Sequence, residues 1–135
     1  MADIAITEGD VVKGTGAKTL NGTFGAVIAA GQTVYKDASD NKYKLFDSDA
    51  AGTSVLAGIS LNSGADGQPC QIFTEGDLTV SSVVTVGTVY MASNTPGGIG
   101  PVADLISGDE VNVVGVGISA TQIKVKIIAS GVDVP

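Results

Sequence analysis

The stretch from Gly31 to Thr74 decides the fold, and it contains Gln32-Thr33-Val34-Tyr35, Val55-Leu56-Ala57-Gly58-Ile59-Ser60 and Gln71-Ile72-Phe73-Thr74. Each run is short, rich in β-branched and aromatic residues, and flanked by polar or glycine-containing segments. This pattern is typical of β-strands joined by turns. No segment of the chain keeps a helical period for long. We therefore expect an all-β fold built from short strands.

Parts of this unit recur in the second half of the chain. Thr33-Val34-Tyr35 returns 55 positions later as Thr88-Val89-Tyr90, and Gly58-Ile59-Ser60 returns 59 positions later as Gly117-Ile118-Ser119. Because two markers return in the same order at nearly the same offset, they indicate a degenerate duplication of one β-unit. The expected organisation is one compact domain with an N-terminal arm and first hairpin in residues 1–30, β-unit A in 31–80 and β-unit B in 81–135.

Length and composition agree with a single domain. A chain of 135 residues is long enough to bury a core without disulfides, and it has one cysteine. Its 19 glycines are about twice the usual share of ~7%, and charged residues make up only 16%. Frequent glycines favour many short strands.

The charge is one-sided and bears on possible partners. There are 14 acidic residues against 7 lysines, with no arginine or histidine, so the net charge is −7. Such a chain repels phosphate backbones and anionic membrane surfaces. We expect protein partners, and neither direct nucleic-acid binding nor membrane binding.

The chain carries no recognisable targeting segment. It begins Met1-Ala2-Asp3-Ile4, with an acid where a signal peptide has basic residues, so we expect synthesis in the cytoplasm. The longest uncharged run, Leu78–Ala103, is interrupted by Pro96 and Pro101. This run therefore predicts surface that a partner covers, not a membrane span.

The first residues have the pattern of an extended arm. Ile4 and Ile6 alternate with Ala5 and Thr7, and no neighbouring stretch is placed to pair with them. We expect residues 2–7 to be disordered in the absence of a partner. The alternative is that this segment is an ordinary first strand of the domain.

Three further patterns predict turns and burial. Asn21-Gly22 is a two-residue hairpin signal, and the turn Thr7-Glu8-Gly9-Asp10 recurs as Thr74-Glu75-Gly76-Asp77, which suggests equivalent corners of a sheet. In the run Ile123–Ile127, alternation points Ile123, Val125 and Ile127 inward against the Val55–Ile59 strand. Lys124 and Lys126 then point outward, where they would protect the edge of a last strand.

The candidate chemical motifs are incomplete. Gly14–Thr19 lacks the glycine spacing of a phosphate-binding loop. The acidic turns that start at Asp37 and Asp47 have calcium-like spacing but lack the required glycine or glutamate, so we expect solvated turns. General bases are most often histidines, and the chain has none. Cys70 lies in an apolar strand pattern, which favours a position in the core. We expect no enzyme activity, no metal site and no cofactor.

Four runs resemble the head-decoration, or capsid-cement, proteins of tailed bacteriophages, with the lambda type as the nearest member. They are Val34–Ser39, Lys42–Asp47, Val55–Ile59 and Gln71–Leu78. In that family, strands separated by a short Asp/Ser turn, an apolar strand with a central Gly-Ile, and a strand with an aromatic residue before a glycine turn form the core. This chain differs by lacking the long proline-rich opening and by carrying the unit twice.

The resemblance implies a small β-barrel or β-tulip that binds the outer surface of an expanded icosahedral capsid and resists internal DNA pressure. The implied partners are the major capsid protein and further copies of the chain, as a trimer on the capsid, and the implied location is the virion. Family members use the start of the chain to add a strand to a capsid subunit. The expected capsid-contacting residues are Ile4, Ile6, Thr7, Val11 and Val12.

A carbohydrate- or receptor-binding module of a head fibre or adhesin is the alternative function. Exposed aromatic residues beside polar loops would favour it. Tyr35, Tyr43 and Tyr90 lie within strand patterns, and we expect them in the core or on a sheet face.

Overall fold

A computed structural model describes residues 3–47, 56–93, 95–104 and 110–133. The described part of the chain is almost entirely β-structure, which confirms the all-β fold. The elements are η1 (Glu8–Asp10), β1 (Val12–Lys13), β2 (Lys18–Thr23), β3 (Thr33–Lys36), β4 (Tyr43–Leu45), β5 (Leu56–Ser60), β6 (Pro69–Thr79), β7 (Val89–Ala92), β8 (Ile99–Pro101), η2 (Val102–Asp104), β9 (Glu110–Gly117) and β10 (Gln122–Asp133).

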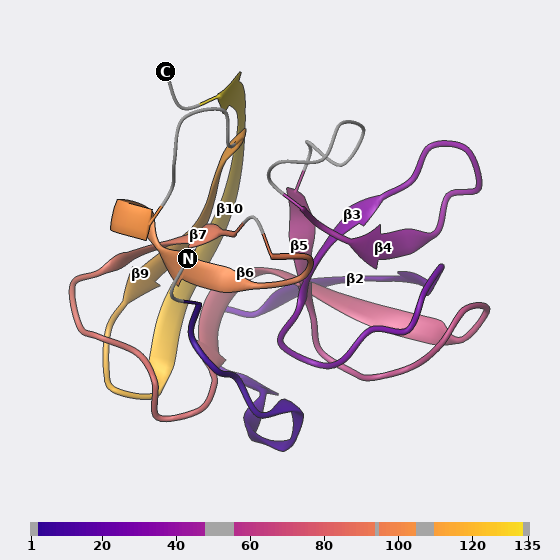
Figure 1. Ribbon diagram of the computed structural model, residues 1–135. Coiled ribbons are helices and arrows are strands. Elements are labelled where there is room, and N and C mark those ends of the chain that lie inside the picture. The colour runs from indigo at the N-terminus through magenta and orange to yellow at the C-terminus, as the bar shows by residue number, and fades with distance from the viewer. Residues whose placement is uncertain (1–2, 48–55, 94, 105–109, 134–135) are drawn as a thin grey trace.

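The strands form one antiparallel sheet curled into a half-barrel. Its order is β4-β3-β5-β6-β10-β9-β7-β8, and β1 and β2 also pair with β6. In Figure 1, the purple strands β2 to β4 lie on one side and the orange and yellow strands β7, β9 and β10 on the other. The eleven-residue β6 connects the two groups, because it pairs with β1, β2, β5 and β10.

The two groups have the same pairing order. β3 lies between β4 and β5, and β7 lies between β8 and β9. Val34 of β3 pairs with Gly58, and Tyr90 of β7 pairs with Gly115; in both strands the register shifts immediately after that residue. By this pairing, Val34 corresponds to Tyr90. The recurring tripeptide in the sequence had instead matched Val34 with Val89. The duplication of the sequence itself stays a prediction.

The core consists of two buried clusters. In the larger one, Ile123 and Val125 of β10 are buried together with Leu56 and Ile59 of β5, as alternation predicted, while Ile127 is half-buried against it. Val55 of the predicted strand lies outside the described residues. The smaller cluster lies where β2 to β6 meet and contains Phe24, Ile28, Val34, Tyr43, Cys70 and Ile72.

Several local predictions are wrong because distant strands determine the conformation. Asn21 and Gly22 do not form a hairpin turn; they lie inside β2 and pair with Gln71 and Cys70. The repeated turn is not a pair of equivalent corners either, since residues 8–10 form η1 and residues 74–77 lie within β6.

One further strand prediction also needs correction. Lys124 and Lys126 are exposed as expected, but β10 lies between β6 and β9 and is no edge strand.

Burial on β6 predicts a large stability difference between two leucine substitutions. Leu78 on β6 is completely buried, whereas Leu20 on the neighbouring β2 is 42% exposed. Leu78→Ala should lower the free energy of unfolding by about 2–5 kcal/mol, because it leaves a cavity in the core. Leu20→Ala, the matched control, should cost less than about 1 kcal/mol. Urea denaturation measures both, and equal losses would contradict the burial of Leu78.

Candidate functional site

The N-terminal arm, residues Asp3–Thr7 in the described chain, lies against the domain. The Ile4 amide donates a hydrogen bond to the Ile99 carbonyl of β8 at 2.9 Å. The side chains of Ile4 and Ile6 are half-buried and pack against the larger core cluster. The expected disorder of residues 2–7 is therefore wrong for residues 3–7, which lie on the domain, and the alternative, an ordinary first strand of the domain, is closer to this arrangement. The segment is extended but is not assigned as a strand.

Serine hydroxyls hold the acidic residues of this region. Ser93 Oγ bonds Asp3 Oδ2 at 2.9 Å, Ser63 Oγ bonds Glu8 Oε2 at 2.7 Å, and Ser81 Oγ bonds Asp10 Oδ2 at 3.0 Å. The Thr7 amide also donates to Ser81 Oγ, at 2.6 Å. These bonds connect the arm and the following turn η1 to three loops that are far away in the sequence.

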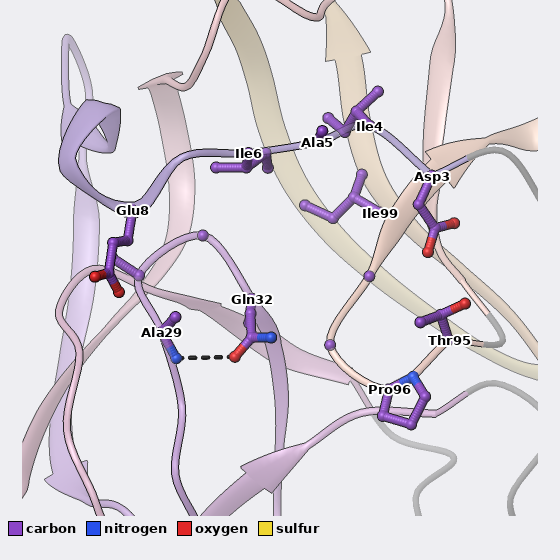
Figure 2. A pocket seen from close by; sticks show the side chains of 14 residues that line it. Asp3, Ile4, Ala5, Ile6, Glu8, Ala29, Gln32, Thr95, Pro96 and Ile99 are labelled. Carbon is purple, nitrogen blue, oxygen red and sulfur yellow. Dashed lines mark hydrogen bonds between the residues drawn. The ribbon is translucent and has the colours of Figure 1, made fainter.

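A cavity of about 430 Å³ lies between the arm and two loops, residues 29–32 and 95–99. Figure 2 shows Ile4, Ala5 and Ile6 along one wall, with Ala29 and Gln32 on one opposing segment and Thr95 and Pro96 on the other. The Ala29 amide donates to Gln32 Oε1 at 2.8 Å, which closes the first loop. We call this cavity and its walls the arm groove.

Two glycines allow the close approach of the arm. A Cβ on Gly31 would lie 2.7 Å from Ile6 Cγ2, and Gly31 also has a positive φ of 93°. A Cβ on Gly98 would overlap Asp3 Oδ2 and lie 2.6 Å from Ser93 Oγ. The arm therefore depends on the absence of side chains at these two positions.

The five residues predicted to contact a capsid do not form one exposed patch. Ile4, Ile6 and Val11 pack against the core, whereas Thr7 is exposed and Val12 is 58% exposed on β1. Sequence reasoning did not find the rest of the arm groove. The only signals in the sequence were the glycines at 31, 97 and 98, which mark close backbone approach.

The calcium-like turn that starts at Asp37 is neutralised by a lysine. Lys44 Nζ lies 2.8 Å from Asp37 Oδ2 and 3.1 Å from Asp40 Oδ2. The hydrogen bond from Lys44, together with bonds from Ser39, lowers the pKa of Asp37; a bond from the Lys42 amide and the Lys44 ammonium lower the pKa of Asp40. The bonds from Lys44 to Asp37 and Asp40 raise the pKa of Lys44. The turn that we expected to be solvated therefore holds a lysine ammonium group between its two carboxylates.

The other candidate motifs have structural positions. In the Gly14–Thr19 stretch, the Gly14 amide donates to the Asp77 carbonyl at 2.7 Å, and Lys18 pairs with Glu75 at 3.3 Å. Cys70 is buried, and burial raises the pKa of its thiol. Of the turn from 47 to 49, only Asp47 lies within the described residues.

Two structural features that would indicate a function are absent from the described residues. Within the described ranges, no group of three or more potential ligand residues is placed to hold a metal ion. No helix in the part of the chain that the structure describes is long and apolar enough to cross a membrane.

Neither a family model nor a curated protein matches the chain. A function must therefore be inferred from the surface and the arm groove.

The Lys44 pairs predict a specific dependence of stability on acid. Because the pKa of Asp37 is lower in the folded chain than in the unfolded one, the unfolded chain binds more protons below about pH 4. The stabilisation is present above that pH and is lost as the pH falls toward the folded pKa. In Lys44→Met, the free energy of unfolding should therefore fall less steeply between about pH 5 and pH 2 than in the parent protein.

Denaturant titrations at stepped pH measure this slope. The matched control is Lys36→Met, because Lys36 is an exposed residue of the same hairpin with no ion pair among the described residues. Its slope should equal that of the parent protein. A parent-like slope in Lys44→Met would refute the role given to this lysine.

Close packing at Gly98 predicts that one added methyl group displaces the arm. In Gly98→Ala, the new Cβ collides with Asp3 and Ser93, so the hydrogen bond from the Ile4 amide should weaken. We expect hydrogen exchange at the Ile4 amide to become at least about tenfold faster, or about 1.4 kcal/mol of local stability. Gly9→Ala is the control, because nothing lies within 4 Å of its Cβ position. Unchanged exchange in Gly98→Ala would argue against the placement of the arm.

Proposed function

We propose that the chain is a structural virion protein that binds the outer surface of an icosahedral phage capsid and stabilises the expanded head. The observation that carries this proposal is the exposure of large apolar side chains on several separate segments of the chain. Val27 is 78% exposed, Val86 65%, Val12 58% and Ile128 50%. A partner that covered these side chains would remove them from water, which would contribute to its binding.

Two other features support a role in assembly. The stretch of residues that resembles head-decoration proteins, 34–78, corresponds to β3, β4, β5 and most of β6. The low charge content of 16% lowers the cost of desolvating a large contact area. The proposed partners are the major capsid protein and two further copies of the chain, which form a trimer on the capsid. The net charge of −7 argues against direct contact with the packaged DNA.

An enzymatic role has less support than this structural one. The chain contains no histidine, and its single cysteine is 4% exposed with a raised pKa, which disfavours the nucleophilic thiolate. The carbohydrate- or receptor-binding alternative also lacks a supporting observation. Tyr43 and Tyr90 are buried, Tyr35 is half-buried, and all three phenylalanines are completely buried. No aromatic side chain is thus left as an open platform for a sugar ring.

Co-sedimentation with phage heads tests the proposal. The protein should sediment with expanded heads of the phage that encodes it, and bind unexpanded heads much less. Val27→Asp, Val86→Asp and Val12→Asp should keep the parent melting temperature, since these side chains are exposed. If one of the three lies in the contact, its replacement should weaken head binding by about tenfold or more, because burying a valine contributes roughly 1.5–3 kcal/mol.

The control is Lys36→Met, an exposed change that adds no carboxylate to an apolar position. Two results would overturn the proposal: no association with expanded heads, or parent-like occupancy for all three valine variants.

A further inference from the structure

The sheet has an outer face, formed by β1, β6, β10 and β9, that bears apolar side chains in contact with water. Leu78 and Ile123 point into the core, so the residues that alternate with them along these strands point outward. Four of the eight large apolar side chains that are exposed in the described chain lie on this face, namely Val12 (58%), Val116 (40%), Ile118 (40%) and Ile128 (50%). The solvated face of an antiparallel sheet is commonly polar. This face is therefore more apolar than contact with water requires.

The charges on the outer face form two adjacent columns of opposite sign. In the register of β6 and β10, Asp77 lies opposite Lys124 and Glu75 lies opposite Lys126. No ion pair joins these two strands in the described chain, and Glu75 pairs instead with Lys18 of β2 at 3.3 Å. Both lysines of β10 are exposed. The two columns are therefore accessible to charges on another molecule.

A groove of about 560 Å³ opens on the same face. Lys124 and Asp77 line it beside Val116 and Ile128, and the loop between β1 and β2 forms part of its wall at residues 15–16. The charged columns and the apolar side chains thus belong to one continuous surface.

We propose that the outer face binds the outer face of a second copy of the chain, about a two-fold axis that runs parallel to the strands between β6 and β10. Such an axis places β10 of each copy over β6 of the other. Because Lys124 is level with Asp77 and Lys126 with Glu75, each lysine then faces a carboxylate of the second copy. The contact is isologous, so every one of these ion pairs forms twice.

The uncharged positions match in the same arrangement. Val12 and Gln122 both pair with Thr79, from opposite sides of β6. The Ile118 amide donates to the Gln122 carbonyl at 3.0 Å. The row across the face is therefore Val12, Thr79, Gln122 and Ile118. The two-fold axis reverses this row, so that Val12 of each copy meets Ile118 of the other, and Thr79 meets Gln122. Apolar side chains thus face apolar ones, and polar side chains face polar ones.

The charge of the whole chain favours this face as the place where two copies meet. Each copy has a net charge of −7, so two copies repel each other in most orientations. On the outer face, Lys124 and Lys126 balance Asp77 and Glu75, and Lys18 adds a further positive charge beside them. Exposed charges elsewhere are screened beyond about 8 Å at physiological salt. The repulsion between copies is therefore weak in this arrangement.

This contact differs from the trimer of the proposed function and does not rest on that function. An isologous contact relates two copies by a two-fold axis, whereas a closed ring of three copies uses heterologous contacts. Isolated protein that pairs in solution but binds no heads would overturn only the capsid role. Protein that binds heads but does not pair would overturn only this inference.

The test is sedimentation equilibrium of the full-length protein from about 1 μM to about 1 mM. We expect reversible association into particles with an even number of copies, and added salt should weaken it because facing ion pairs contribute to the contact.

Exchanging the charges tests the facing columns directly. Lys124→Glu with Lys126→Glu makes carboxylates face carboxylates, and Asp77→Lys with Glu75→Lys makes lysines face lysines. Each double variant should associate at least tenfold more weakly than the parent protein. In an equimolar mixture of the two, all facing charges are again opposite, so the mixture should associate at least tenfold more tightly than either variant alone.

Single substitutions test the apolar contact. Ile118→Asp should keep the parent melting temperature, because the side chain is partly exposed, and should weaken association at least tenfold. Val27→Asp is the matched control, since Val27 is 78% exposed but lies between β2 and β3, outside this face. Lys36→Glu on β3 is the control for charge reversal. Both controls should associate like the parent.

Three results would overturn the inference: particles of only one or only three copies at every concentration, no gain on mixing the two charge variants, or parent-like association of Ile118→Asp. If a charge-reversed variant fails to fold, as its melting curve would show, Lys124→Ala with Lys126→Ala replaces it. Parent-like association of that neutral variant would equally refute the facing columns.

Discussion

The pairing of β6 with β10 is the constraint on which the rest of the sheet depends. β5 pairs with β6 at Ser60 and Ile72, and β9 pairs with β10 at Gly117 and Ile123. If these pairs are equivalent, Glu75 of β6 corresponds to Lys126 of β10, and those two residues pair directly with each other. Under this equivalence, a local two-fold axis between β6 and β10 would relate the two groups of strands. A one-residue slip would turn the buried side chains of a strand to the other face. The register of β6 and β10 therefore determines which side chains are buried in both groups of strands.

A consequence of this symmetry is that each end of the sheet needs its own cover. The outermost strands are β4 and β8, and exposed edges invite pairing with other chains. At β4, the Gly25 amide donates to the Tyr43 carbonyl at 2.8 Å; at β8, the Ile4 amide donates to the Ile99 carbonyl at 2.9 Å. The arm thus covers the edge of β8, as the segment after β2 covers the edge of β4.

The sequence predicted those features that depend on neighbouring residues. Alternation placed Ile123 and Val125 in the core, because a strand with one buried face must repeat every two residues. The Asn21-Gly22 signal failed because β2 forms a ladder with β6 about fifty positions away, and tertiary pairing outweighs a local turn preference. The arm could not be placed for the same reason: its hydrogen-bond partner, Ile99, is in the distant β8. The groove carboxylates gave no signal, since an unpaired acid and a paired one look alike in a sequence.

The chain has more acidic residues than its lysines can balance. Lys18, Lys42 and Lys44 form ion pairs within the chain. With 14 acidic residues and only 7 lysines, some carboxylates must remain without a cation. The serine-held acids beside the arm groove are such carboxylates. Exposed charge of this kind acts within about 8 Å at physiological salt, so it affects how a partner is oriented on approach more than how tightly the apolar surfaces hold it. For a partner of the kind proposed, apolar contact with side chains such as Val27 and Val86 would then supply most of the affinity, and these carboxylates would mainly affect its approach.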